Sequence, residues 1–474
     1  MDAVRIVLAV GLLQKGNVVL SGDVTAAYLQ APLRGDPTWL LLPQQLWPPA
    51  WFDAAGRPIW KRPVVRLERA LYGLKRSGFD WAAKATRVLH EHGWTPVCDE
   101  QENFFWKKID NELMVLCIYV DDILAAGQER KLTEELEKMR FPDYISPSED
   151  PNLLFFRMSK AEVAKHFLGM DFSAIYIENE LPKLRISQPD YTRMLVAQYR
   201  ELFEFTGAFR RYKTPADDQE ISYVGTGDDY ETIGPHASSA PRMIGGLLYL
   251  VRCARPDCMF VVCKLGRWAA KWSRQCEKIL HRLISYLAFT IDYSLVMTGR
   301  KNNDSSVFLL GFTDADHAGE VASSHSTSGC CLFLADTAGE MKCLLSWRSK
   351  KQTVVAGSTG EAEIVATHDA TKAVPIPFVG TFDAFMPLLG FMFGDASVAE
   401  RCIKAGWSKN MRYVRKHQRV RISMLHDIYN EEENHCQCFY RHVPSEDNTA
   451  DTFTKALPAA SFQKHASFLG IQSE

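Results

Sequence analysis

The sequence has little cysteine and no long apolar run. Its 474 residues include 12 cysteines, and no two CxxC motifs stand at zinc-ribbon spacing, which excludes a disulfide scaffold and a zinc ribbon and predicts reduced cysteines. The apolar stretches 4–13 and 374–393 are broken by Arg5 and by Asp383 with three prolines. Neither supplies the roughly 18 uninterrupted apolar residues of a spanning helix. We therefore expect a soluble protein that has no membrane partner.

Net charge is also nearly absent, because 55 Lys and Arg face 57 Asp and Glu, which gives −2. Any binding of nucleic acid must therefore depend on local basic patches. A content of 46% hydrophobic and 24% charged residues is that of an ordinary globular protein and excludes collagenous, disordered and coiled-coil chains. At roughly 150 residues per domain, the length predicts about three domains.

The segment before residue 140 alternates strand and helix patterns. Residues 17–24, NVVLSGDV, predict a strand that ends at Asp23. The runs LMVLCIYV and ILAAG predict a hairpin whose tip carries Asp121 and Asp122. Between them, residues 79–92 predict a helix that buries one face, made up of Trp81, Ala85, Val88 and Leu89.

If the strand ending at Asp23 neighbours this hairpin, three carboxylates converge at one sheet edge. Such a cluster suits divalent ions like Mg²⁺, which prefer oxygen ligands and in pairs clamp the attacking and leaving oxygens of phosphoryl transfer. A solvated Asp-Asp turn is the simpler alternative for an isolated pair of acids. The flanking residues decide between a metal site and such a turn.

A second constellation of acids lies near the C-terminus. Residues 141–151 predict a linker, and 152–300 predict mostly helices. After them come strands within 306–337, a capping box formed by Ser358 and Glu361, a strand ending at Asp395 and a closing helix that begins near Asn448. Strand ends and helix starts thereby gather four acids that suit two further divalent ions: Asp314, Glu363, Asp395 and Asp451.

Two choices are made within this constellation. Glu363 is preferred to Glu361 because it stands in an E-x-x-A context, and Asp314 is preferred to Asp316 because it is the acid nearer the strand end. Strand alternation is taken to point Asp316 away from the site. A surface role is the ordinary alternative for any one of these acids alone.

The motifs LSGDVTAAYLQAPL, LERALYGLKRSGFDW and LCIYVDDILAAG occur in this order and resemble the reverse transcriptase of copia-type LTR retrotransposons. FTDADHAG, STSGCCLFL, SWRSKKQTVVAGSTGEAEIVA and NTADTFTKAL resemble the RNase H domain of the same elements. The resemblance implies an α/β protein with an α+β palm, a helical thumb and connection, and an RNase H-like mixed sheet. The corresponding ranges are 1–140 for partial fingers and palm, 141–300 for thumb and connection, and 303–474 for RNase H.

The resemblance also implies the chemistry and its ligands. Asp23, Asp121 and Asp122 would hold two Mg²⁺ or Mn²⁺ ions for RNA-directed DNA synthesis. The second set of acids would hold two more for cleavage of RNA in a hybrid. Partners would be an RNA template, a DNA primer, an RNA:DNA hybrid and dNTPs, together with capsid and integrase, in a cytoplasmic virus-like particle or in the nucleus.

Further residues are assigned to nucleotide and strand binding. Tyr28 falls where an aromatic ring excludes a ribose 2′-hydroxyl, Gly73 lies where the palm approaches template and nucleotide, and Lys75 is a phosphate contact. A core aromatic and a surface lysine remain the alternatives. The run 409–421 has six cations and no acid and suits phosphates, with binding assigned to Lys409, Arg412, Arg415 and Lys416. A solvated helix face is the alternative there.

Several departures from the family pattern leave other functions open. Only 22 residues, with one Arg and one Lys, precede Asp23, so we expect most of the fingers to be missing. Arg76 and Gly78 replace the usual Gln and Pro, and Ala396 replaces an Asn. The rival hypotheses are a decayed element copy that at most binds nucleic acid, and a nuclease that acts only on hybrids.

Overall fold

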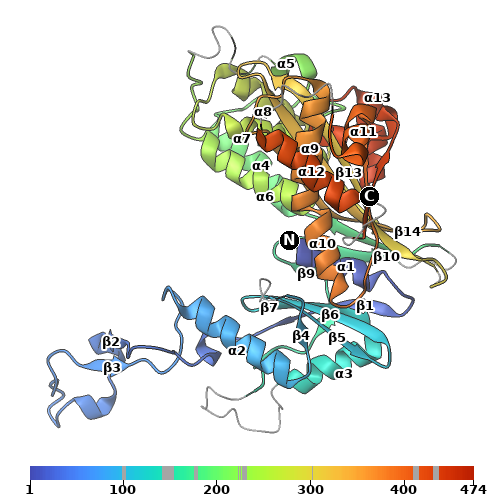
Figure 1. Cartoon of the computed structure of the whole chain (residues 1–474). Helices are drawn as coiled ribbons and strands as arrows, with labels where there is room; N and C mark the ends of the chain where they lie inside the picture. Colours follow the sequence, from blue (N-terminus) through green and yellow to red (C-terminus); the bar gives the residue numbers. More distant parts are fainter. Residues whose placement is uncertain are drawn as a thin grey trace. The chain divides into compact units, whose positions relative to one another are not determined.

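The computed structural model describes residues 1–98, 103–140, 154–175, 180–222, 224, 226, 232–301, 303–408, 416–430 and 437–473, without the side chains of 416–418. Internal contacts divide the chain into two units (Figure 1). The palm unit is Val18–Val163, and the second unit joins Met1–Asn17 to Ala164–Glu474. The predicted linker at 141–151 lies entirely outside the described residues.

The palm unit is built on an antiparallel sheet with the strand order β4-β5-β6-β7-β1-β8. Its strands are β1 (Asn17–Asp23), β4 (Thr95–Pro96), β5 (Phe104–Ile109), β6 (Glu112–Tyr119), β7 (Asp122–Gln128) and β8 (Glu162–Val163). Helices α2 (Ser77–Glu91) and α3 (Glu129–Met139) share one apolar core with alternate residues of β6 and β7. The predicted face of α2 is confirmed. Because Leu89 is fully buried, its truncation to Ala should cost about 2–5 kcal/mol.

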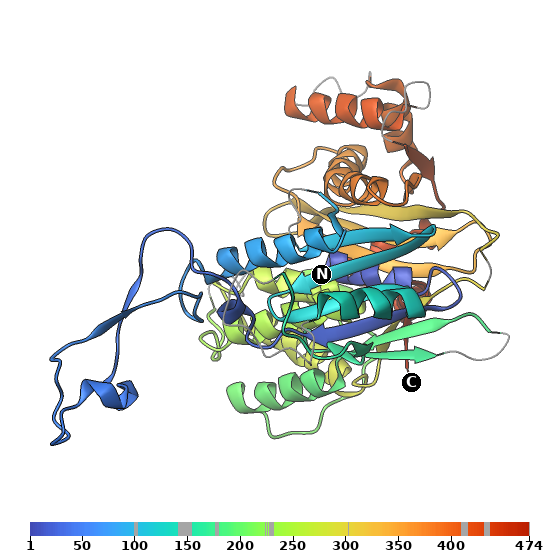
Figure 2. The same cartoon turned by 90° about the horizontal axis from the view of Figure 1, so that it is seen from below.

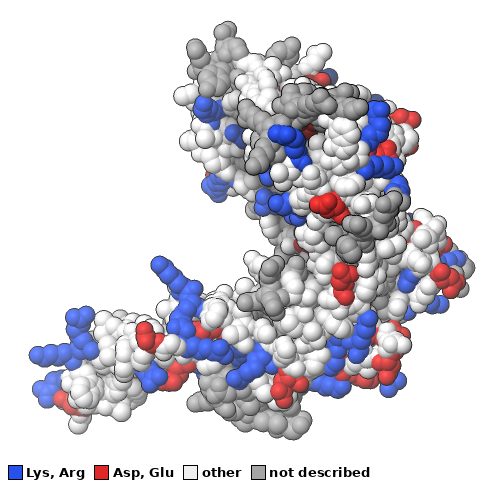
Figure 3. Space-filling model, in the orientation of Figure 1, with Lys and Arg blue, Asp and Glu red and all other residues white. Residues whose placement is uncertain are grey.

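An arm extends from the palm unit between β1 and α2 (Figure 2). It carries the two-stranded ribbon of β2 (Trp39–Leu41) and β3 (Val64–Arg66) and short 3-10 turns at Ala27–Gln30 (η1), Gln44–Leu46 and Pro49–Trp51. Figure 3 shows Lys and Arg side chains along this arm. Large apolar side chains are exposed there as well, among them Trp39 and Trp60. The ribbon end of the arm therefore contributes little to the core, whereas Ala27, Ala31 and Ala70 at its base belong to it.

The second unit contains a ten-stranded sheet. Its long strands β13 (Val307–Glu320), β14 (His325–Asp336) and β15 (Lys342–Lys351) are antiparallel, whereas β16 (Gly390–Gly394) and β17 (Cys438–His442) are parallel to β13. Parallel neighbours require a crossover, and helix α9 (Thr359–Ala373) provides it between β15 and β16. Almost every residue of β14 is buried, which indicates that both faces of the sheet are covered. The mixed sheet predicted for this region is confirmed.

The same sheet continues beyond β15 with short antiparallel strands: β12 (Ser294–Thr298), β11 (Lys183–Ser187), β10 (Met170–Ile175), β9 (His166–Phe167) and, paired with β12, β18 (Ile471–Gln472). The remaining helices of the second unit are α1 (Asp2–Gly11), α4 (Pro189–Leu202), α5 (Asp218–Ser222), α6 (Ala240–Cys253), α7 (Met259–Arg267), α8 (Arg274–Ala288), α10 (Pro375–Asp383), α11 (Ser397–Ala405), α12 (Lys416–Tyr429) and α13 (Ala459–Leu469). The region 152–300 is therefore not purely helical, and its division from RNase H at residue 300 stays a prediction.

Helix α1 lies against β15 in this unit. The Arg5 guanidinium stacks on the Trp347 ring at 3.7 Å and donates to the carbonyl of Leu345 at 3.1 Å. Burial lowers the pKa of Arg5 to about 10. The cation that interrupts the first apolar stretch is thus accommodated by an aromatic face and backbone oxygens. No helix among the described residues is both long and apolar enough to cross a membrane.

Candidate active sites

The first acid cluster lies at one edge of the palm sheet. Asp23 is the last residue of β1, Asp121 lies in the β6–β7 turn and Asp122 begins β7. Strands β1 and β7 are neighbours, and the backbone N–H of Val24 donates to the carbonyl of Asp121 at 2.6 Å. Burial, followed by the charges of Asp121 and Asp23, raises the pKa of Asp122. The predicted convergence of the three acids is thus observed.

The turn that presents these acids is strained. Val120 has φ +57°, a left-handed conformation that is unfavourable for a β-branched residue. The indole N–H of the buried Trp81 donates to the Val120 carbonyl at 2.6 Å. Helix α2 therefore holds the turn in place. The sequence pattern identified Trp81 only as a core residue, because its polar contact depends on how helix and hairpin pack.

The predicted nucleotide contacts come from two neighbouring segments. Tyr28 lies in η1, half-buried, with its ring centroid 4.6 Å from that of Tyr72. Gly73 has φ +95° with open space where a Cβ would stand, so its backbone conformation, rather than crowding, requires glycine. Lys75 is exposed. The packing of Tyr28 on Tyr72 joins two motifs that are separate in the sequence.

The second acid cluster surrounds β13. Among the described residues, Asp314, Asp395 and Asp451 form a group in which one carboxylate oxygen from each lies within 4.8 Å of the others. Glu363 of α9 accepts a hydrogen bond from the Ala315 N–H at 3.4 Å. Burial, followed by Asp451, raises the pKa of Asp314 to about 7. Burial, followed by Asp314 and Asp395, raises the pKa of Glu363 well above its ordinary value. All four predicted acids therefore interact.

Local contacts fix the geometry of this cluster. Asn448 caps a 3-10 turn, η7 (Thr449–Phe453), by accepting from the Ala450 N–H, and it also donates to the Thr313 carbonyl at 3.0 Å. Asp451 is thus tied to β13. Asp395 accepts from the Ser445 hydroxyl at 2.6 Å. The predicted cap at Asn448 is confirmed, but the helix that it was expected to begin is this short turn, and α13 starts later, at Ala459.

Two residues of the cluster escaped the sequence analysis. The Lys455 ammonium lies 3.0 Å from Asp451 Oδ1, and the Thr454 hydroxyl donates to Asp314 Oδ2. Burial lowers the pKa of Lys455, but the carboxylates of Asp314 and Asp451 outweigh it and raise that pKa to about 12. The available signal was helical spacing, since these residues stand three and four positions after Asp451.

The preference for Glu363 over Glu361 agrees with the structure. The Ser358 hydroxyl accepts from the Glu361 N–H at 3.2 Å, and the Glu361 carboxylate accepts from the Gly357 N–H at 2.8 Å. Glu361 is thereby engaged in the predicted capping box.

The reasons given for preferring Asp314 to Asp316 were wrong. Strand β13 continues to Glu320, so Asp314 is not at its end, and residues two apart in a strand face the same side. Burial raises the pKa of Asp316 to about 6, with Lys455 lowering it and Asp314 raising it. Asp316 therefore interacts with the cluster. Asp314 remains the better candidate because its oxygens, unlike those of Asp316, belong to the close group.

The basic run 409–421 is only partly described. Lys409, Arg412 and Arg415 lie outside the described residues, as does the side chain of Lys416. Within α12, Arg419 is exposed and Arg421 is half-buried. The assignment of this run to phosphate binding stays a prediction.

The donor atoms of both clusters fit divalent ions. Each cluster offers several carboxylate oxygens, the ligands that Mg²⁺ and Mn²⁺ prefer. Burial, followed by repulsion from neighbouring carboxylates, raises the pKa of Asp122 in the first cluster and of Asp314 in the second. A cation placed between the oxygens would relieve the repulsion. The Lys455 ammonium relieves only part of the repulsion in the second.

Comparison with known proteins identifies a reverse transcriptase domain and its relatives. Residues 1–215 match the model of reverse transcriptase (RNA-dependent DNA polymerase). The chain is 26% identical over 460 residues to the Retrovirus-related Pol polyprotein from transposon TNT 1-94 of Nicotiana tabacum, which covers 95% of this chain and 31% of that protein. The chain is also 26% identical to the Retrovirus-related Pol polyprotein from transposon RE2 of Arabidopsis thaliana, and this match covers 99% of this chain and 28% of that protein. The chain thus spans about a third of these relatives' length.

Among solved structures, the foamy viral protease-reverse transcriptase in complex with ds DNA has a TM-score of 0.46 at 11% identity, over 93% of this chain and 59% of that one. That likeness is too distant to support an inference. The sequence matches carry the comparison instead. The chain contains a reverse transcriptase domain in its first 215 residues, and its homologues over nearly its whole length are copia-type Pol polyproteins from plant transposons.

Proposed function

We propose that the chain has two phosphoryl-transfer sites, a DNA polymerase in the palm unit and a nuclease for RNA:DNA hybrids around β13. The observation that carries the proposal is the close group of Asp314, Asp395 and Asp451, in which one carboxylate oxygen from each lies within 4.8 Å of the others. Two of these carboxylates are buried and Asp395 is half-buried, and like charges removed from water in this way are costly unless a cation compensates them. The reverse transcriptase match supports the polymerase, because the palm acids stand in the matched region.

In the nuclease site, Asp314, Glu363, Asp395 and Asp451 would hold two Mg²⁺ or Mn²⁺ ions. Such ions stabilise the charge that develops on the attacking and leaving oxygens of phosphodiester cleavage. Thr454 and Asn448 orient the carboxylate of Asp314 and the turn of Asp451 respectively. These two neighbours hold the acids before any ion binds, which reduces the reorganisation required for chemistry.

In the polymerase site, Asp23, Asp121 and Asp122 would hold the ions that bind the triphosphate. Tyr28, supported by Tyr72, would pack against the sugar of the incoming dNTP. Gly73 would let the backbone approach template and nucleotide, and Lys75 would contact a phosphate. Trp81 holds the turn that carries two of the acids. The proposed substrates are an RNA template with a DNA primer, and dNTPs.

Primer extension and hybrid cleavage with Mg²⁺ or Mn²⁺ test the two sites separately. Asp121→Asn should abolish extension and leave cleavage, whereas Asp395→Asn should do the reverse. Matched controls are Asp110→Asn, in an exposed turn of the palm unit, and Asp292→Asn, exposed in the second unit. Normal cleavage by Asp395→Asn would refute the nuclease site. A folded wild type that is inactive in both assays would favour the decayed copy, and cleavage without extension would favour a nuclease alone.

Location and protein partners are proposed from the resemblance to Pol polyproteins. We propose that the chain acts in a cytoplasmic virus-like particle or in the nucleus, together with capsid and integrase. The run 409–421 would bind nucleic-acid phosphates. Replacing Arg412, Arg415 and Lys416 by Ala should flatten the dependence of log affinity on log salt, and an unchanged slope would identify a solvated face.

A further inference from the structure

A groove of about 820 Å³ lies in the second unit, where α8, α13, β18 and the segment 211–213 meet. Its volume is within the range of small-molecule sites, about 300–1,000 Å³. The groove contains no residue of either acid cluster. Its lining divides into a buried back wall and an exposed rim, and the two have different chemistry.

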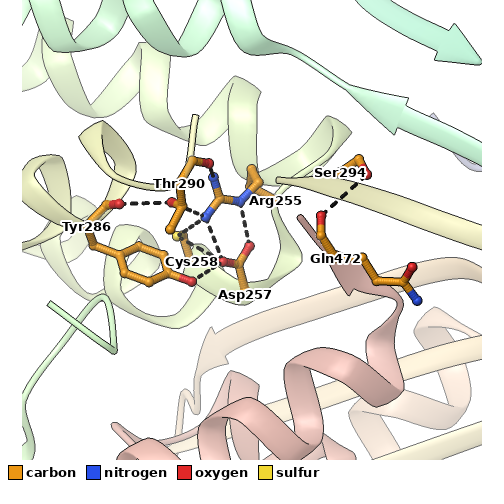
Figure 4. A network of polar contacts seen from close by, with 7 residues as sticks. All are labelled: Arg255, Asp257, Cys258, Tyr286, Thr290, Ser294 and Gln472. Carbon is orange, nitrogen blue, oxygen red and sulfur yellow. Dashed lines mark hydrogen bonds and ion pairs between the residues drawn. The ribbon is translucent and has the colours of Figure 1, made fainter. Parts of the chain in front are cut away.

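The back wall is held by a buried ion pair (Figure 4). Arg255 donates to both oxygens of Asp257, at 2.9 and 2.8 Å, and to the Thr290 carbonyl at 2.8 Å. The Tyr286 hydroxyl donates to Asp257 at 3.0 Å. Tyr286 and Thr290 line the groove, so this network fixes two of its wall residues. Because Arg255 is fully engaged, it acts as a support for the wall and leaves ligand binding to the rim.

The rim carries positive charge that the groove does not neutralise. Arg211 and Lys213 line it and are exposed. Among the described residues no salt bridge joins either of them to an acid, and none of the described lining residues is Asp or Glu. A positive electrostatic potential in a concave surface favours an anionic ligand.

Aromatic rings stand beside these cations. Phe289 is 47% exposed although it is a large apolar side chain, and it lines the groove together with Tyr293. The Tyr293 ring lies 5.5 Å from the Arg255 guanidinium carbon, a cation–π contact that holds it. Phe289 is thus exposed and Tyr293 half-buried. Accessible rings next to cations without an acidic partner are the combination that binds a nucleobase by stacking and its phosphate by charge.

We propose that this groove binds a nucleotide unit, with the phosphate at Arg211 and Lys213 and the base against Phe289 and Tyr293. The unit belongs either to a free nucleotide or to a nucleic-acid strand, which share this chemistry. An apolar peptide fits less well, because it would leave both cations without a counter-charge. The site goes beyond the proposed function, since it needs neither acid cluster nor a metal ion.

Photo-cross-linking of the full chain in EDTA tests the site. One probe is 5-iodo-dUMP and the other is a short oligothymidine that carries one 5-iodouracil, a base that cross-links to aromatic rings. Mass spectrometry should find adducts on Phe289 or Tyr293. Adducts with the mononucleotide indicate a free nucleotide, and adducts with the oligothymidine alone indicate a strand. The Arg211→Ala/Lys213→Ala variant should lower the yield at least fivefold.

The matched control is Arg274→Ala/Lys278→Ala, which removes two exposed cations of α8 outside the groove and should leave the yield unchanged. Phe289→Trp should keep affinity for the probe, and Phe289→Ala should lower it several-fold. Because these side chains are exposed, the fold should persist, which circular dichroism checks. Absence of adducts on both rings with both probes, or an unchanged yield in the Arg211/Lys213 variant, would overturn the proposal.

Discussion

The acids at the palm edge lie at or near the surface, whereas three of the four around β13 are buried and Asp395 is half-buried. Asp23 is exposed and Asp121 and Asp122 are half-buried, but Asp314 is 2% and Glu363 4% exposed. Solvent screens repulsion in the open cluster, while the buried one draws on Lys455, Thr454 and Asn448. Similar donor sets therefore impose different demands on the surrounding protein, and the buried cluster should respond more strongly to charge changes.

The largest effect should be on nuclease activity. Asp314→Asn or Glu363→Gln should lower hybrid cleavage about 100-fold or more, because each removes a charged ligand from a two-metal site. Asp316→Asn should leave most of the activity, since its oxygens lie outside the close group. Cleavage rates with Mn²⁺ and Mg²⁺ measure this. If Asp316→Asn were as inactive as Asp314→Asn, the assignment of ligands would be wrong.

The next effect concerns pH and stability without metal. The pKa of Asp314 is raised from 3.8 to about 7 in the folded chain, so the folded state binds this proton more tightly than the unfolded state does. The contribution of Asp314 to the stability of the fold is therefore present at low pH and is lost as pH rises through about 7. Asp314→Asn mimics the protonated form and should stabilise the chain in EDTA at pH 8 by about 2 kcal/mol. Near pH 4 the gain should vanish. Asp23→Asn should give no comparable gain in stability. Equal gains from Asp314→Asn and Asp23→Asn would contradict the contrast between the buried and the open cluster.

Lys455 offers a smaller test. Lys455→Met leaves the buried carboxylates without their ammonium and should destabilise the metal-free chain at pH 8 by about 1–2 kcal/mol, after allowing for partial solvent screening. Mg²⁺ should restore most of the loss. Thermal denaturation with EDTA and with Mg²⁺ measures both effects. An equal loss in the two buffers would mean that Lys455 acts through packing alone.

The smallest effect is expected in the open cluster. Trp81→Phe removes the hydrogen bond to the strained Val120 carbonyl and should cost about 1 kcal/mol. Primer extension should fall several-fold, with hybrid cleavage unchanged, because the turn carries only the polymerase acids. A variant that loses both activities equally would show that Trp81 supports the fold as a whole.

The residues that sequence reasoning placed correctly are those fixed by local pattern. Asp23 ends a strand, Asp121 and Asp122 occupy a hairpin tip, and Ser358 caps a helix; each signal lies within a few residues. The short strands β10, β11 and β12 were missed because they are only five or six residues long and are interspersed among helices. Thr454 was missed because its partner Asp314 is 140 positions away and is brought close only by folding. Lys455 was missed although its partner Asp451 stands only four positions before it.

The wrong reasons for setting Asp316 aside have a different origin. The pattern was read correctly as a strand, but its period of two was applied wrongly, since residues two apart share a face. The strand was also expected to end near Asp314, whereas β13 continues through an irregular register between Asp316 and Glu320. Because β13 continues past Asp314 with this irregularity, Asp316 stays within the electrostatic field of Asp314.

The docking of α1 on β15 affects how the chain is made. Arg5 and Leu345 are in contact although 340 positions separate them, and the palm unit, Val18–Val163, is inserted between these two parts of the second unit. An emerging chain therefore carries an apolar helix without its partner until β15 is synthesised, a condition that favours slow folding and capture by chaperones. Within the palm unit, Leu20 pairs with Val163, so the insertion enters and leaves through adjacent strands. Its excision with a short joining loop is thus topologically permitted.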